Sequence, residues 1–392
     1  MPSTTPFDFS SIPVISYPTS SEENGKFITS LQNALISTGF FYLSGAPVSP
    51  ETISNLVSYI PKLFALPPEE KDKFAMVHSP HFLGYTRLGT EWTKQKVDWR
   101  EQIDIATPMT SRWNGKEEER WMNIWGPSQY PDESVLPGFK DAIDTYQAEV
   151  TKLGNQLVRF IAQALGLGPD GLDKFYEVPQ KMQHRGKIVA YPVPDKEEGE
   201  RGQGVGPHYD AGFLTILLQA SSHPGLQVQN LSGKWIDASP KPGTFVINFG
   251  RALEFATQGI VRATSHRVLS PPATDEWRKI GPRYSVPFFH NIDMCVRMGD
   301  REKYGLECED SHTSLHPLLV EPKSSMIVSE EILRLRDARG TLGNTDSVNY
   351  SEFLTEPSGK VQLVGRVKSH PDVGEKHYPE LFKKLFPNGL PN

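Results

Sequence analysis

Cysteine is scarce in this 392-residue chain, which contains only Cys295 and Cys308. The two residues do not form a Cys-x-x-Cys pair, so the sequence predicts neither a zinc ribbon nor a thiol redox motif. We expect two free thiols in a reducing compartment.

Long hydrophobic runs are also missing. No stretch approaches the roughly 20 apolar residues that a membrane-spanning helix needs. The N-terminal residues lack the basic and apolar regions of a secretory signal, and the C-terminal Gly-Leu-Pro-Asn does not match a peroxisomal or endoplasmic-reticulum signal. We therefore expect no membrane partner and a cytoplasmic location.

A strong basic charge is absent as well. The formal net charge is -6 and the sequence pI is about 6.0. Without a basic stripe, nucleic acid is excluded as an expected partner. The content of 37% hydrophobic and 22% charged residues is typical of a soluble globular protein. The oligomeric state stays open, and a small molecule is the expected partner.

Three segments have the periodicity of amphipathic helices. They span residues 26–38, 50–66 and 139–165, and the last has apolar residues at alternating steps of three and four. Short strands are predicted at residues 12–15 and 40–43. Residues 78–98 combine Gly, Thr, Trp and charge without periodicity, so they are predicted to form a loop.

The pattern changes after residue 187 to short β-type runs separated by turn residues. The runs cover residues 188–191, 214–218, 226–229, 243–249, 265–269 and 284–289. This pattern is typical of a sandwich, jelly roll or barrel. The fold class is therefore mainly β with flanking helices. We expect one compact unit over 1–392, with an N-terminal helical and β region (1–180), a core (181–295) and a C-terminal region (296–392).

The segment Gly206-Pro-His208-Tyr-Asp210 contains a candidate metal site. Residues two apart on a strand point to the same face, so His208 and Asp210 can converge on one point. His266 lies in another β-type run and can complete the set. Two His residues and one carboxylate with open positions are the ligand set of non-haem Fe(II) oxygenases, and the lack of thiolate argues against structural zinc.

A second pair of residues has the same two-residue spacing. Arg283 and Ser285 flank Tyr284 in a β-type run and should face one way. A guanidinium binds a carboxylate through two parallel hydrogen bonds, and a hydroxyl can add a third. This pair could therefore hold the distal carboxylate of a small dicarboxylate near the metal.

The order His-x-Asp, His, then Arg-x-Ser resembles the 2-oxoglutarate/Fe(II)-dependent dioxygenase superfamily. It looks most like the isopenicillin N synthase branch. Connecting segments that match this branch are Ile12-Pro-Val-Ile15, Thr38–Leu43, Gly225–Val228, Gly233–Ile236 and Pro242–Asn248. The likeness covers about residues 11–295 and continues more loosely to the end.

The resemblance implies a double-stranded β-helix (jelly roll) core, and Fe(II), 2-oxoglutarate and O2 as cofactor and cosubstrates. His208, Asp210 and His266 are the implied catalytic iron ligands. Arg283 and Ser285 are implied to bind 2-oxoglutarate, with Tyr191 beside them because Ala190-Tyr191-Pro192 resembles the family's Asn-x-Tyr-Pro element.

Two departures from the family pattern bear on these roles. Val189 stands where the family has Asn. The interval between His266 and Arg283 is also longer than usual, and we interpret residues 270–279 as an extended hairpin loop.

Four further residues are candidates for substrate contact. Tyr85, Arg87 and Trp92 lie in the irregular segment, and loops often carry specificity. Phe289 shares the face of Arg283 and Ser285 by alternation. We expect hydroxylation or desaturation of a small organic molecule in secondary metabolism. The alternatives are an oxidase or oxidative cyclase like isopenicillin N synthase that does not use 2-oxoglutarate, a non-catalytic binding protein, and a cupin-like metal isomerase.

Overall fold

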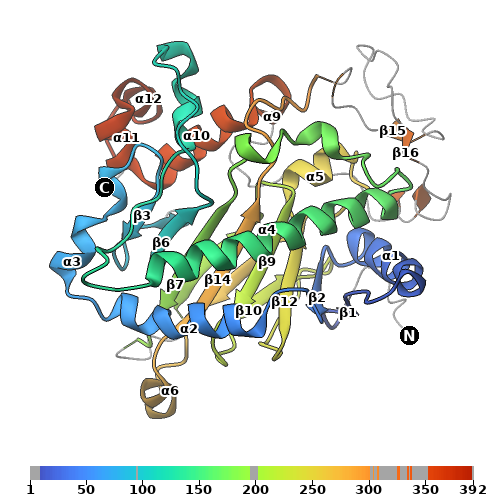
Figure 1. Cartoon of the computed structure of the whole chain (residues 1–392), viewed down its shortest axis with the longest axis horizontal. Helices are drawn as coiled ribbons and strands as arrows, with labels where there is room; N and C mark the ends of the chain where they lie inside the picture. Colours follow the sequence, from blue (N-terminus) through green and yellow to red (C-terminus); the bar gives the residue numbers. More distant parts are fainter. Residues whose placement is uncertain are drawn as a thin grey trace.

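The computed structural model describes residues 9–93, 96–194, 202–300 and 352–390, together with the short pieces 303, 307–308, 325–326, 333–334 and 336–337. For Trp92, only the backbone is described. Figure 1 shows a large sheet crossed by one long helix, with shorter helices at both ends of the sheet.

The three predicted helices are present with small shifts at their ends. They are α1 (Ser21–Ile36), α2 (Pro50–Phe64) and α4 (Phe139–Ala164). Helix α2 begins where Pro50 occupies the first turn and the Ser49 side chain accepts a hydrogen bond from the Thr52 N–H. The buried side of α4 follows the apolar stripe, and this helix runs across the face of the sheet (Figure 1).

The major sheet has eight strands in the order β1-β2-β12-β9-β14-β7-β6-β3. Their bounds are β1 Val14–Ser16, β2 Phe40–Ser44, β3 Gly84–Thr86, β6 Glu101–Ala106, β7 Arg185–Tyr191, β9 Leu214–Gln219, β12 Thr244–Phe249 and β14 Arg283–His290. The N-terminal strands thus extend the sheet on both sides of its central four strands.

The minor sheet has four strands in the order β11-β10-β13-β8. They are β8 (Gln203–His208), β10 (Leu226–Gln229), β11 (Trp235–Asp237) and β13 (His266–Leu269). Consecutive strands from β7 to β14 therefore divide between this sheet and the centre of the major one. This arrangement is the predicted jelly-roll core with flanking helices.

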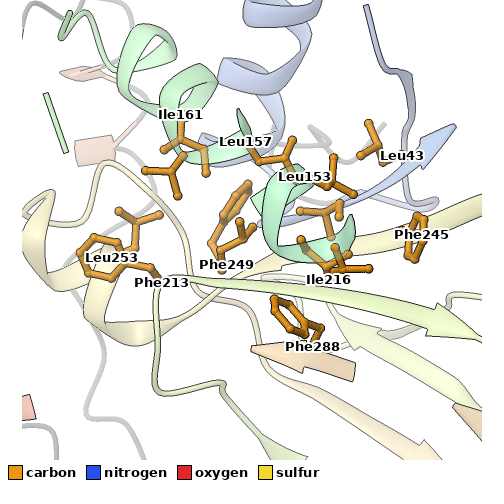
Figure 2. Packing of buried hydrophobic residues seen from close by; sticks show 14 of the residues in the cluster. Leu43, Leu153, Leu157, Ile161, Phe213, Ile216, Phe245, Phe249, Leu253 and Phe288 are labelled. Carbon is orange, nitrogen blue, oxygen red and sulfur yellow. The ribbon is translucent and has the colours of Figure 1, made fainter. Parts of the chain in front are cut away.

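The largest apolar core lies between the major sheet and the helices. In Figure 2, Leu153, Leu157 and Ile161 of α4 lie over Ile216 and Phe288 of the sheet. A smaller apolar cluster, with Tyr42, Val189 and Val228 among its members, fills part of the space between the two sheets. Because side chains alternate along a strand, the major sheet has one face in each of these layers.

Two segments differ from the sequence-based expectation. The presumed loop at 78–98 contains β3 and the short hairpin of β4 (Trp92–Thr93) and β5 (Lys96–Val97), which no periodicity marks because the strands are so short. The presumed hairpin loop at 270–279 contains the start of α6 (Asp275–Ile280), whose first turn is capped by the Thr274 hydroxyl accepting from the Trp277 N–H.

The other α-helices whose bounds the structure describes are short. They are α3 (Pro68–Lys73), α5 (Arg251–Ala256), α9 (Glu352–Thr355), α10 (Ser358–Ser369), α11 (Pro371–His377) and α12 (Pro379–Leu385). In Figure 1, α10, α11 and α12 lie together near β3 and β6. Within the described ranges, no helix is both long and apolar enough to cross a membrane.

Candidate active site

Three candidate ligand side chains converge between the two sheets. His208 ends β8 and His266 begins β13, and the two residues are direct partners across the minor sheet. Asp210 follows two residues after His208. Its Oδ1 atom lies 3.9 Å from Nε2 of His208 and 3.9 Å from Nε2 of His266. One ligand atom from each residue thus lies within 4.8 Å of the other two.

The second nitrogen of each imidazole fixes which atom is free for a metal. Nδ1 of His208 lies 2.8 Å from the Gly206 carbonyl, and Nδ1 of His266 lies 3.1 Å from the Thr264 carbonyl. A carbonyl oxygen only accepts, so each Nδ1 must carry the proton. Nε2 of each ring is therefore the nitrogen directed toward Asp210, which is the orientation that metal-binding His residues need.

Asp210 is held by two partners at its other oxygen. Oδ2 accepts a hydrogen bond of 2.6 Å from the Thr215 hydroxyl and one of 2.7 Å from the Asn248 amide. Thr215 lies on β9 and Asn248 on β12, which are neighbouring strands in register. These bonds leave Oδ1 directed at the two imidazoles. Neither residue is predicted from the sequence, although both share the inward alternation of their strands.

Burial and charge set the protonation states of the cluster. Burial, together with the neighbouring His266, lowers the pKa of His208 to about 4. Burial alone would raise the pKa of Asp210, but the two imidazoles and the bonds from Asn248 and Thr215 lower it. At neutral pH His208 is therefore a neutral imidazole and Asp210 a carboxylate. This donor set, without thiolate, fits Fe(II) and leaves further coordination positions open.

The second predicted pair lies on the same inner face of the major sheet. Arg283 and Ser285 of β14 pair with Tyr191 and Val189 of β7. The Arg283 guanidinium lies over the Tyr191 ring, 4.9 Å from its centroid. Tyr191 thus adjoins Arg283 even though Val189 replaces the family's Asn. The longer segment before β14 does not turn Arg283 and Ser285 away from this face.

Two glycines of the minor sheet make room for this pair. A Cβ on Gly204 would meet the Tyr191 ring at 2.9 Å, and one on Gly225 would approach Arg283 Cδ at 3.4 Å. Gly204 and Gly225 therefore belong to the close packing around Tyr191 and Arg283.

The structure separates the four candidate substrate residues. Phe289 lines a cavity of about 290 Å³ together with Thr215, whose hydroxyl binds Asp210. Tyr85 belongs to the core on the helix side of the sheet, and its hydroxyl donates to Glu101 at 2.6 Å. Arg87 is exposed and pairs with Asp72. Tyr85 and Arg87 are therefore not brought to the metal cluster, and the Trp92 side chain lies outside the described residues.

Family models match two parts of the chain. Residues 12–133 match a model described as the N-terminal domain of non-haem dioxygenases in morphine synthesis. Residues 181–292 match the model of the 2OG-Fe(II) oxygenase superfamily. This matched segment contains all three candidate metal ligands, His208, Asp210 and His266.

Known proteins extend this likeness over most of the chain. A 2-oxoglutarate-dependent dioxygenase, frbJ, from Dothideomycetidae sp. is 37% identical over 95% of this chain and 94% of its own length. A homoarginine-6-hydroxylase of Arabidopsis thaliana is 32% identical over 76% of this chain and 90% of its own. A Neurospora crassa protein solved in complex with alpha-KG has a TM-score of 0.61 and 25% identity, covering 74% of this chain and 87% of that one.

The chain belongs to the 2-oxoglutarate-dependent, non-haem Fe(II) dioxygenases. It is an oxidoreductase that uses Fe(II), 2-oxoglutarate and O2. The predicted family, enzyme class, fold and cofactors are confirmed. The cosubstrate also decides against the alternative of an oxidase that does not use 2-oxoglutarate.

Proposed function

We propose that this enzyme hydroxylates a small organic molecule at an iron held by His208, Asp210 and His266. The observation that carries the proposal is the convergence of Oδ1 of Asp210 on the Nε2 atoms of His208 and His266, each 3.9 Å away. Bound iron and 2-oxoglutarate supply the activation of O2, with release of succinate and CO2. The protein's own residues orient the ligands and the cosubstrate.

Arg283, Ser285 and Tyr191 form the proposed 2-oxoglutarate subsite. Arg283 is 1% exposed, so its interaction with a carboxylate would be weakly screened by water. The Tyr191 ring beneath the guanidinium limits its movement, and Ser285 presents a hydroxyl on the same face. Asn248 and Thr215 keep Asp210 in one orientation through their bonds to Oδ2.

The substrate and its pathway are proposals from two sources. A named relative is a homoarginine-6-hydroxylase, so L-homoarginine is the first compound to try. The sequence-based expectation of a secondary-metabolite tailoring step, by hydroxylation or desaturation, widens the search to other small acids and amines. The cytoplasmic location, the absence of a nucleic-acid partner and the division at residues 180 and 295 stay predictions.

The test is an anaerobic titration of the Fe(II)-loaded protein with 2-oxoglutarate, following the visible charge-transfer absorption. We expect the band in the wild type, its loss in His266→Ala because iron is lost, and a much higher half-saturating concentration in Arg283→Leu. Arg267→Leu is the matched control because Arg267 is adjacent to His266 on β13 but donates to Gln227. A band that survives unchanged in both His266→Ala and Arg283→Leu would refute the assigned residues.

A further inference from the structure

The cavity beside Asp210 has a cationic lining. Its walls include Arg185 and Lys187 from β7, Phe289 from β14 and Arg366 from α10, and its volume is about 290 Å³. No carboxylate is among the described residues that line it. Thr215 belongs to the same lining and binds Asp210, so the cavity begins one side chain from the metal cluster.

Most charges around this cavity are paired. Arg366 lies 3.0 Å from Asp104, and Lys187 lies 3.6 Å from both Asp104 and Glu91. Arg100 lies 2.8 Å from Glu91 and 3.3 Å from Asp98. Every carboxylate of this network thus already has at least one cation.

Arg185 differs from these neighbours. In the described part of the chain, no carboxylate lies within ion-pair distance of it. Its Nη2 donates to the carbonyls of His81 and Ile124, the latter at 3.1 Å. Its Nε and Nη1 atoms are buried and have no hydrogen-bond partner. One positive charge in the network is therefore left without an anion.

Keeping such a guanidinium buried is costly. Arg185 is 4% exposed, and a buried charge without a counter-ion destabilises a fold strongly. Burial, with a smaller contribution from Arg366, lowers its pKa to about 9, so it stays charged at neutral pH. A buried cation with free donors at a cavity near the reacting centre is the arrangement expected of an anion-binding site.

We propose that Arg185, assisted by Arg366, binds a carboxylate of the substrate, so that the enzyme acts on small organic acids or amino acids. The inference rests on the proposed function and adds the substrate class. The carboxylate would accept from the Arg185 guanidinium, and Phe289 would contact the apolar part of the same molecule. The cavity then places the remainder of the substrate toward Asp210.

This anion site is distinct from the 2-oxoglutarate subsite. Arg283 pairs with Tyr191 at one end of the β7–β14 ladder, whereas Arg185 pairs with Phe289 near its other end. Six residues along a strand span roughly 20 Å. One 2-oxoglutarate molecule is too short to reach both guanidinium groups.

The experiment measures thermal stabilisation of the protein loaded with Mn(II) and saturating 2-oxoglutarate. The probes are matched acids and primary amides: L-homoarginine and L-homoargininamide, benzoate and benzamide, acetate and acetamide. We expect at least one acid to raise the melting temperature where its amide does not. Its apparent affinity should fall about 10- to 100-fold in Arg185→Gln, since charge-assisted bonds are lost, and less in Arg366→Gln.

Controls separate this inference from folding and from the proposed function. Arg262→Gln removes another buried arginine, which donates to the Ser37 carbonyl, and should retain the preference for the acid. Arg185→Lys keeps the charge if Arg185→Gln fails to fold, and should keep part of the preference. If no acid is preferred over its amide, or the preference survives in Arg185→Gln, the anion site is refuted. If Arg185→Gln instead loses 2-oxoglutarate binding while Arg283→Leu keeps it, the cosubstrate subsite was misassigned and the proposed function must be revised.

Discussion

The two faces of the major sheet are built from the same strands but have opposite characters. Toward α4, strand β14 presents Val286 and Phe288, which are both buried in the apolar core. Toward the minor sheet, the same strand presents Arg283, Ser285 and Phe289. Strand β7 repeats the contrast, with Ile188 on the helix side and Arg185 and Lys187 on the inner side.

The two faces of the sheet have different roles: the helix-side face stabilises the fold, and the inner face carries the groups of the site. The helix-side face holds the continuous apolar core, so most of the burial that stabilises the protein lies there. The inner face can then carry charges and hydrogen-bonding groups without interrupting that core. A shift of one residue in a strand would move its apolar side chains to the inner face and its polar side chains to the core. The register of β7 and β14 therefore determines both the core and the site.

The largest expected effect tests the core side of this contrast. Phe288→Ala should lower the free energy of unfolding by about 3–5 kcal/mol, because a fully buried aromatic ring is replaced by a cavity. Urea unfolding followed by circular dichroism measures the loss. Phe289→Ala is the matched control on the opposite face, where the half-buried ring lines a cavity that already exists. Equal losses in the two variants would contradict the division of roles.

Much of this division could be predicted from the sequence. The two-residue spacing of His208 and Asp210, and of Arg283 and Ser285, requires only that each pair shares a face. The helix of residues 139–165 was predicted from its apolar stripe for the same reason. Local periodicity therefore identified both the stripe that packs on the sheet and the residues that face inward.

Other parts of the site depend on contacts that no local pattern encodes. Arg185 lies on the same face as Tyr191 by alternation, yet its place in a cavity depends on Arg366, which is far away in the chain. Tyr85 was a reasonable pocket candidate in an irregular segment, but β3 pairs with β6 in the register Tyr85–Ile103, which turns the ring to the helix side. Contacts between segments far apart in the chain decided these positions.

The next expected effect concerns the inner face. Asn248→Ala should weaken metal binding roughly 10- to 100-fold, because residues that orient a metal ligand have effects of that size. The amide donates to Oδ2 of Asp210 at 2.7 Å, and its loss leaves Thr215 alone to orient the carboxylate. Competition with a fluorescent chelator measures the affinity. Asn230→Ala, in the turn after β10, is the control; equal weakening there would show a general structural effect.

A third prediction uses the titratable groups on the helix side. His184 and His290 stack with ring centroids 4.1 Å apart, and burial lowers the pKa of His184 to about 3 and that of His290 well below its usual range. Below pH 6.5 each of these two His residues is protonated in the unfolded chain but stays neutral in the folded one. The free energy of unfolding therefore falls as the pH falls.

For His184 alone, the loss between pH 6.5 and 5.0 should be about 2 kcal/mol. His184→Asn keeps an acceptor for the Asn291 N–H, which donates to Nδ1 of His184 at 3.0 Å. Urea unfolding at both pH values should show a shallower pH dependence in the variant than in the wild type. An unchanged slope would mean that the folded protein accommodates a charged imidazole on this face.

The smallest expected effect compares a single hydroxyl on the inner face with the same change on the helix side. Ser285→Ala should raise the KM for 2-oxoglutarate roughly 3- to 10-fold, because one hydrogen bond to a carboxylate is lost while Arg283 remains. Ser285 is buried, but a Cβ is retained, so the melting temperature should change little. Succinate formation at varied 2-oxoglutarate measures KM. Thr151→Ala removes a hydroxyl from α4 on the other side of the sheet, and should leave KM unchanged. A rise in KM of the same size in Thr151→Ala would show that the two faces are coupled, and that the cosubstrate responds to packing as strongly as to its own contacts.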